Sequence, residues 1–79
     1  MTLPEAILHV LVAARRALPP EVIRAECNAF LRESPTLSDV KAELHRLAAL
    51  EPPLVRGTAR ALGGNVWAAT PDGRLEVLE

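Results

Sequence analysis

The sequence predicts a small α+β domain in which three helices precede a two- or three-stranded antiparallel sheet. Apolar residues recur at helical spacing in three segments before residue 50, and proline pairs at 19–20 and 52–53 interrupt the pattern. After residue 53 the apolar residues fall in short segments separated by glycine- and proline-containing turns, which is typical of strands. The 79 residues are enough for one domain, 1–79, and a hydrophobic content of 49% permits a buried core.

The first helix is predicted between Thr2 and the proline pair 19–20. Thr2 and Glu5 have the spacing of a capping box, in which a hydroxyl and a carboxylate accept hydrogen bonds from free backbone N–H groups. Pro4 lies in the first turn, where its missing N–H costs nothing. The predicted buried stripe consists of Leu3, Ile7, Leu11, Ala14 and Leu18.

The second helix is predicted to begin at Pro20, which suits the first helical position, and Glu21 favours the positive end of the helix dipole. Ser34-Pro35 ends the pattern, because the residue before a proline is disfavoured in a helix. The predicted buried stripe consists of Ile23, Cys27, Phe30 and Leu31. We therefore expect Cys27 to behave as a small buried hydrophobic residue.

The third helix is predicted to begin after Thr36, which can cap it, with Asp39 as the acidic partner three residues on. We expect it to extend to about Leu50, because the proline pair 52–53 cannot continue it. Its apolar stripe consists of Leu37, Val40, Leu44 and Leu47.

Short strand-like segments occupy the rest of the chain. Residues 54–57 form the first and residues 66–70 the second, with a glycine- and asparagine-containing turn at 63–65 between them. Residues 70–73 give a second turn signal, and the alternation over 74–77 favours a third strand or an extended C-terminal tail. We expect Trp67 to fill the gap between the sheet and the helices.

This order of elements resembles the winged-helix variant of the helix-turn-helix domain. The resemblance lies in TLSDVKAELHRL over 36–47, LVRG over 54–57 and WAATPDGR over 67–74, an order shared with many bacterial transcriptional regulators. It implies a three-helix bundle with a C-terminal wing sheet, a recognition helix at about 36–50 and a wing at about 54–70. In this family the third helix enters the major groove of double-stranded DNA, and the wing contacts the backbone or the minor groove.

The face of the third helix opposite its leucine stripe carries the side chains that would meet DNA. Ser38 and His45 can hydrogen-bond base edges or phosphates, and Arg46 can bind a phosphate or a guanine. The small side chain of Ala42 would allow the helix to approach the groove closely, and Lys41 lies on one flank of the same face.

In the wing, Arg60 is the only charged residue between Gly57 and Asn65, where a phosphate or minor-groove contact would be made. Arg56 lies near the sheet edge and can assist. The predicted DNA-binding residues are Ser38, Lys41, Ala42, His45, Arg46, Arg56 and Arg60.

The charge balance predicts weak binding by each subunit. Residues 36–74 carry five basic and four acidic side chains, and the whole chain has a formal net charge of -1. Three to five phosphate contacts predict a log–log salt slope of only about −3 to −4.5 per subunit. We therefore expect a homodimer on a two-fold site if DNA is the partner.

The alternative is a winged-helix protein–protein interaction module or dimeric adaptor that does not bind DNA. The pI of about 6.1 and the acidic pair Asp39 and Glu43 beside the reading face favour it. On this interpretation Arg46, Arg60 and His45 are solvated surface side chains. Shallow apolar patches for a partner could form from Ala42, Ala49, Ala13 and Ala17.

Other function classes find no support in the sequence. Cys27, His9 and His45 lack zinc-site spacing, and no phosphate loop or nucleophile elbow is present, so we expect no enzyme, metal or cofactor. We expect His9 to lie at the edge of the core. No apolar run approaches the roughly 18–20 residues of a membrane span, and no secretory signal is recognisable. These features predict a cytoplasmic protein with no membrane partner.

Overall fold

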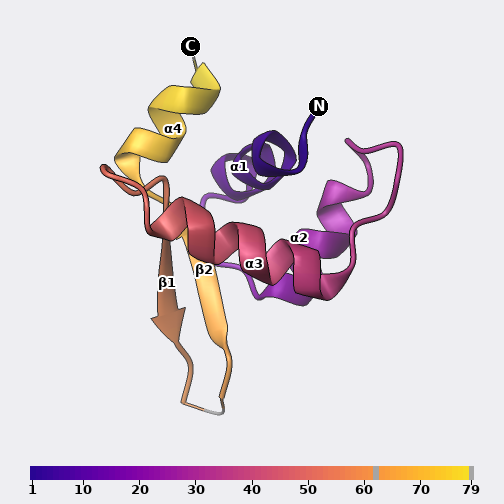
Figure 1. The fold of residues 1–79 in the computed structure, drawn as a ribbon. Coiled ribbons are helices and arrows are strands. Elements are labelled where there is room, and N and C mark those ends of the chain that lie inside the picture. Colours follow the sequence, from indigo (N-terminus) through magenta and orange to yellow (C-terminus); the bar gives the residue numbers. More distant parts are fainter. Residues whose placement is uncertain (62, 79) are drawn as a thin grey trace.

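The computed structural model describes residues 1–61 and 63–78, and within them the chain is α+β with four helices and one two-stranded antiparallel sheet (Figure 1). The predicted wing and the predicted domain include residues 62 and 79, which lie outside the described residues. The elements in chain order are α1 (Leu3–Ala14), α2 (Pro20–Cys27), α3 (Leu37–Ala48), β1 (Val55–Ala59), β2 (Asn65–Ala69) and α4 (Pro71–Leu78).

The helices form one body from which the hairpin projects. Helix α1 packs against α2, α3 and α4, and the β1–β2 hairpin extends past α3, away from the end where both chain termini lie (Figure 1). The two strands pair in a register that joins Val55 to Ala69 and Ala59 to Asn65. This arrangement leaves one long side of α3 next to an extended hairpin.

Both predicted capping boxes are confirmed. In α1 the Thr2 N–H donates to Glu5 Oε1 over 3.0 Å, and the Glu5 N–H donates to the Thr2 hydroxyl over 3.4 Å. The hydrogen bond from the Thr2 backbone lowers the pKa of Glu5. In α3 the Thr36 N–H donates to Asp39 Oδ2 over 3.2 Å and the Asp39 N–H donates to the Thr36 hydroxyl over 3.0 Å. These caps set the starts of α1 and α3.

Helix α1 ends four residues before the predicted end of its stripe at Leu18. Arg15 adopts the left-handed conformation, with φ 56° and ψ 23°, and this turns the chain out of the helix after Ala14. Leu18 is buried, but as a strand-like residue: its N–H donates to the Trp67 carbonyl and the Trp67 N–H donates to the Leu18 carbonyl, both over 2.8 Å. The prediction of a helix through Leu18 is wrong because these reciprocal hydrogen bonds require an extended backbone.

Helix α2 also ends earlier than expected, at Cys27. Ile23 and Cys27 are fully buried, as predicted, and Leu31 is partly buried. Phe30, however, is 45% exposed, so its assignment to the buried stripe is wrong. The helix stops before Phe30, and helical spacing therefore no longer determines where that ring points. The ring lies against His9, with the centroids 6.2 Å apart.

Helix α3 is close to the prediction. Val40, Leu44 and Leu47 are almost completely buried, and Leu37 at the first position is partly buried. A hydrogen bond of 2.8 Å from Arg24 Nε to the Pro35 carbonyl ties the segment before α3 to α2. The buried stripe fixes the rotation of α3, so its opposite face is available to solvent.

The predicted third strand or extended tail over 74–77 is wrong, because this segment belongs to helix α4. Thr70 acts as its cap: the hydroxyl accepts a hydrogen bond of 3.1 Å from the Gly73 N–H and donates one of 2.6 Å to the Pro53 carbonyl. Pro71 occupies the first helical position, where proline is favoured. The Thr-Pro-Asp-Gly segment, predicted as a turn, therefore forms the start of helix α4.

The position of Gly73, three residues after the Thr70 cap, requires a glycine. A Cβ atom at Gly73 would lie 2.1 Å from the carbonyl oxygen of Leu54, so no other residue fits without a backbone shift. The close approach holds α4 against the start of the hairpin, where the Thr70 N–H also donates to the Leu54 carbonyl over 3.1 Å. Trp67 joins the core cluster with the buried residues of α1, α2 and α3, as expected. None of the helices in residues 1–61 and 63–78 combines the length and apolarity that crossing a membrane requires.

Candidate nucleic-acid interface

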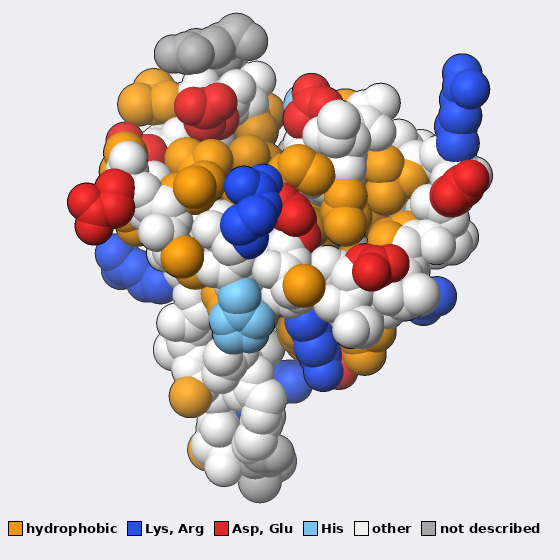
Figure 2. Space-filling model, in the orientation of Figure 1, with side chains coloured by type: hydrophobic (Ala, Val, Ile, Leu, Met, Phe, Trp, Pro, Cys, Tyr) orange, Lys and Arg blue, Asp and Glu red, His pale blue; other side chains and the backbone are white. Residues whose placement is uncertain are grey.

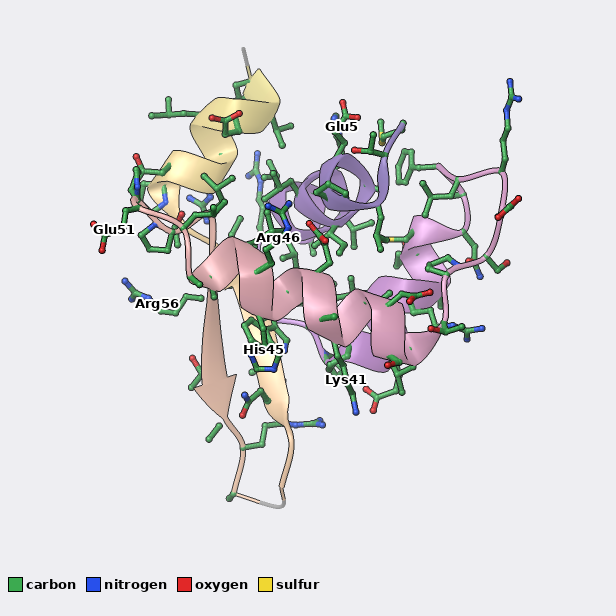
Figure 3. All side chains as sticks on the ribbon, in the orientation of Figure 1. Glu5, Lys41, His45, Arg46, Glu51 and Arg56 are labelled. Atoms are coloured by element: carbon green, nitrogen blue, oxygen red, sulfur yellow. The ribbon has the colours of Figure 1, made fainter. Side chains whose placement is uncertain are left out.

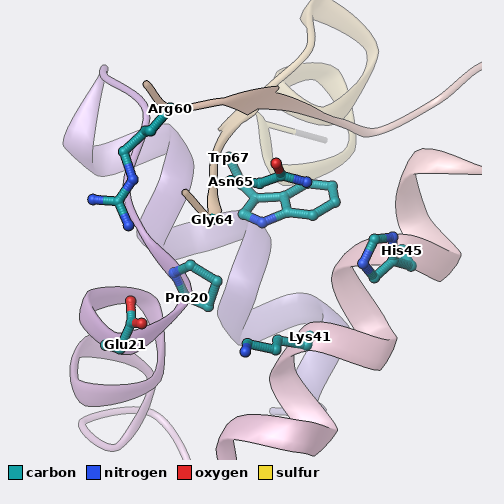
Figure 4. Close-up of a pocket in the computed structure, with 8 residues that line it drawn as sticks. All are labelled: Pro20, Glu21, Lys41, His45, Arg60, Gly64, Asn65 and Trp67. Carbon is teal, nitrogen blue, oxygen red and sulfur yellow. The ribbon is translucent and has the colours of Figure 1, made fainter. Parts of the chain in front are cut away.

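A surface cavity of about 250 Å³ lies where the start of α2, the middle of α3 and the hairpin meet (Figure 4). We call it the α3–hairpin cavity. It is lined by Pro20, Glu21, Lys41, His45, Arg60, Gly64, Asn65 and Trp67. Three of these residues, Lys41, His45 and Arg60, belong to the set that the sequence predicted for DNA binding.

Helix α3 supplies two of the three basic side chains. Lys41 and His45 are four residues apart, so they lie on successive turns of the same side of the helix. Figure 3 shows both side chains on the hairpin side of α3. Both residues are exposed. Their position follows from the buried stripe, because packing Val40 and Leu44 inward turns the next residue in each case toward the hairpin.

The imidazole of His45 stands edge-on to the indole of Trp67. The ring centroids are 5.0 Å apart and the planes meet at 85°, which is the favoured T-shaped geometry. Trp67 is held in turn by its two backbone hydrogen bonds to Leu18. Gly57 lies across the sheet from Trp67, and a Cβ atom at Gly57 would come within 2.8 Å of the indole ring. The sheet therefore determines where His45 packs on the exposed side of α3.

The hairpin turn directs Arg60 toward the same cavity. The Arg60 N–H donates to the Gly64 carbonyl over 2.9 Å, and the Gly63 N–H donates to the Arg60 carbonyl over 3.2 Å. Gly63 and Gly64 have φ values of 90° and 75°, a region that residues with a Cβ atom rarely adopt. A Cβ atom at Gly64 would lie 3.3 Å from Arg60 Nη2, so the guanidinium packs along the turn. Figure 4 shows it extending from the hairpin toward the start of α2.

The electrostatics of the cavity are mixed. Lys41 and Arg60 contribute cations, and Glu21 on α2 contributes a carboxylate on the side of the cavity where Arg60 lies (Figure 4). Across the whole face of the molecule, acidic and basic side chains are interspersed over the helices, and the visible face of the hairpin carries few charges (Figure 2). On the face shown in Figure 2, a polyanion would therefore meet a local cluster of cations and no extended basic surface.

Arg46 lies apart from this cavity. Figure 3 places its side chain on the side of α3 that faces away from the hairpin and from His45. Its Nε donates to Glu43 Oε1 over 2.8 Å, and its Nη2 forms an ion pair with the same oxygen. The hydrogen bond to Glu43 raises the pKa of Arg46. The Arg46 side chain is 54% exposed, yet a carboxylate one turn away already compensates its charge.

The other predicted residues are exposed but do not line the cavity. Ser38 and Ala42 lie on the solvent-exposed part of α3, and Arg56 on β1 points away from the hairpin (Figure 3). The sequence did not single out Pro20, Glu21 and Asn65 as site residues. Their sequence signals concern a helix start and a turn, and only tertiary packing brings them beside α3.

Metal binding or thiol chemistry in residues 1–61 and 63–78 would require a cluster of ligands or a reactive cysteine. No three His, Cys, Asp or Glu side chains gather there at metal-binding distance. Cys27 is free and buried, and burial raises the pKa of its thiol to about 11. No protein-family model, curated protein or solved structure matches this chain.

Proposed function

We propose that this chain is a winged-helix protein that binds double-stranded DNA as a transcriptional regulator, with α3 as recognition helix and the β1–β2 hairpin as wing. The observation that supports this most strongly is the convergence of Lys41 and His45 from α3 with Arg60 from the hairpin around one surface cavity. Two elements far apart in the sequence present basic side chains to one surface, as a duplex would require.

The dimensions of α3 suit a DNA groove. Its 12 residues span about 18 Å at 1.5 Å per residue, and the major groove of B-DNA is about 12 Å wide. Ser38 and Ala42 continue the exposed face on which Lys41 and His45 lie. In the proposed complex, this face meets the bases while Arg60 contacts a phosphate on the flanking backbone or in the minor groove.

The charges predict weak, salt-sensitive binding by one subunit. Contacts from Lys41, Arg60 and one further basic group would give a log–log salt slope of about −2.7. Arg46 adds little while it is paired with Glu43, and Glu21 opposes the cations in the cavity. Measurable affinity is therefore expected below physiological salt.

Fluorescence anisotropy with a labelled random duplex at several salt concentrations tests this proposal. Lys41→Ala and Arg60→Ala should each weaken binding and flatten the salt slope by about 0.9. Arg32→Ala is the matched control, because Arg32 is an exposed arginine that does not line the α3–hairpin cavity. Equal effects of all three substitutions, or no binding to duplex by the parent chain at low salt, would refute the proposed function.

The second candidate is a winged-helix module that binds protein. The carboxylates of Glu21 and Glu43, one in the cavity and the other compensating Arg46, favour it over a polyanionic partner. On this alternative, Ala42→Glu on the exposed face of α3 abolishes association with the partner. Added duplex would then leave the melting temperature unchanged at low salt.

A further inference from the structure

We propose that the groove between α1 and α2 is where a second copy of this chain docks, related to the first by a two-fold axis that runs along the groove. The groove has a volume of about 420 Å³. One wall is formed by His9 and Ala13 of α1 and by Arg16, which lies just after the end of that helix. The other wall is formed by α2 and its continuation, with Val22, Glu26 and Phe30. We call this surface the α1–α2 groove.

The groove exposes apolar side chains that the fold itself does not cover. Phe30 is 45% exposed and Val22 is 38% exposed, although both belong to residue types that are usually buried. The ring of Phe30 is already oriented by His9, 6.2 Å away between centroids, so it would lose little freedom on association. Large aromatic side chains in such positions are the usual anchors of protein interfaces.

The distribution of charge indicates which partner fits. Arg16 lies on the α1 wall and Glu26 lies on the α2 wall. Within the described residues, the structure forms an ion pair between Arg46 and Glu43 and none at Arg16 or Glu26. The charges of Arg16 and Glu26 are therefore available to pair with groups on another chain. A two-fold axis along the groove places the α1 wall of each copy over the α2 wall of the other.

Under that symmetry, the wall that carries Arg16 in each copy lies over the wall that carries Glu26 in the other, so the attraction between these opposite charges acts twice. His9 of each copy likewise comes over Phe30 of the other. An isologous interface requires a self-complementary surface of this kind. An unrelated partner would have to supply both an acidic and a basic group at the matching spacing, whereas a second copy supplies them by symmetry.

This proposal does not rest on DNA binding. No residue lines both the α1–α2 groove and the α3–hairpin cavity, so the two proposals concern separate sets of side chains. If both proposals hold, the dimer carries two α3–hairpin cavities. If DNA is not the partner, the dimer is still expected.

Sedimentation equilibrium from about 1 µM to about 1 mM protein measures the association directly. The mass should rise from 8.5 kDa toward twice that value. Ala13→Arg places a bulky charge in the middle of the groove, and Phe30→Ser removes the aromatic anchor; each should weaken association at least about tenfold. Ala49→Arg, at an exposed alanine outside the groove, is the control and should leave it unchanged.

Charge reversal identifies the partner as a second copy. Arg16→Glu and Glu26→Arg should each weaken self-association, because like charges then face each other twice. An equimolar mixture of these two single variants should associate again, since every facing pair becomes attractive. The substituted positions Ala13, Arg16, Glu26, Phe30 and Ala49 are all exposed. Circular dichroism melting curves of each variant check that it folds.

Three results would overturn the proposal. The parent chain could stay monomeric up to about 1 mM, which excludes even a weak dimer. A dimer could form that is insensitive to Ala13→Arg and Phe30→Ser, which places the interface elsewhere. The mixture of the two charge-reversed variants could fail to associate, which excludes the two-fold arrangement.

Discussion

Arg46 and Glu43, one turn apart on α3, are joined by two hydrogen-bonding nitrogens of the guanidinium on a single carboxylate oxygen. Because Arg46 is paired with Glu43, its guanidinium is less available to bind a phosphate than the sequence predicts. The pairing also turns the guanidinium away from His45 and the hairpin (Figure 3). A polyanion that approached α3 would therefore meet a guanidinium whose charge Glu43 already compensates.

Glu43→Gln should strengthen binding to duplex DNA. The substitution removes one negative charge and releases Arg46, so we expect a gain of roughly three- to tenfold in affinity and a salt slope steeper by about 0.9. In the same anisotropy assay, Arg46→Ala should have little effect alone and should cancel the gain in the Glu43→Gln background. Glu76→Gln, at an exposed carboxylate on α4, controls for net charge. Equal gains from both glutamate substitutions would contradict a specific role for Glu43.

Gly57→Ala should disturb the packing that positions His45. The added methyl group would lie 2.8 Å from the Trp67 ring, so the indole must shift and the T-shaped contact with His45 must change. Overpacking of this kind costs about 1–3 kcal/mol of folding stability. Chemical denaturation followed by Trp67 fluorescence measures this loss, and the folded-state emission should also change. Thr58→Ala, the exposed neighbour on β1, should alter neither. A native emission spectrum in the Gly57→Ala protein would argue against the contact.

The buried thiol of Cys27 should be unreactive in the folded protein. Burial raises its pKa from an ordinary value near 9.0 to about 11, so almost no thiolate exists at pH 8. A disulfide reagent such as 5,5′-dithiobis(2-nitrobenzoic acid) should react slowly in buffer and rapidly in denaturant. Fast labelling of the native protein would show that the core opens at α2.

The same shift predicts how stability depends on pH. Because the folded pKa is raised, the unfolded chain loses this proton first, and the contribution of Cys27 to folding stability falls from about pH 9 to about pH 11. Denaturant midpoints measured across this interval should decline more steeply in the parent chain than in Cys27→Ala. If the midpoints of the parent chain and of Cys27→Ala decline equally with pH, other titrating groups cause the loss of stability.

Much of the fold could be predicted from local patterns. The starts of α1, α2 and α3 were predictable because capping side chains and prolines act over three or four residues. The α3 stripe was predictable because a helix buried on one face repeats its contacts with a fixed period. In the candidate site, this placed Lys41 and His45 on the exposed side of α3.

The remaining errors come from interactions between distant segments. Leu18 is buried by pairing with Trp67, a contact across 49 positions in the sequence that no helical period indicates. The Thr70 cap of α4 is completed by the Pro53 carbonyl, and Gly73 is required by the Leu54 carbonyl. Sequence reasoning also counted Arg46 as a free cation, although Glu43 three residues earlier offered the signal for a helical ion pair.

The early end of α1 gives the last prediction, that Arg15→Gly stabilises the protein. Arg15 has a φ of 56°, a conformation that costs residues with a Cβ atom roughly 1–2 kcal/mol and glycine little. Glycine also makes the unfolded chain more flexible, which offsets roughly 0.5–1 kcal/mol of that gain. The net expectation is a stabilisation of up to about 1 kcal/mol, equivalent to a rise of about 4–8 °C in Tm per kcal/mol for a domain of this size.

Thermal melting by circular dichroism measures the change in Tm, and Arg16→Gly is the matched control. Arg16 carries the same charge at the next position, but its φ is not positive, so glycine brings only the entropic cost there. The Arg15→Gly protein should melt above the parent and the Arg16→Gly protein at or below it. If both substitutions lower Tm, the left-handed conformation of Arg15 does not limit stability.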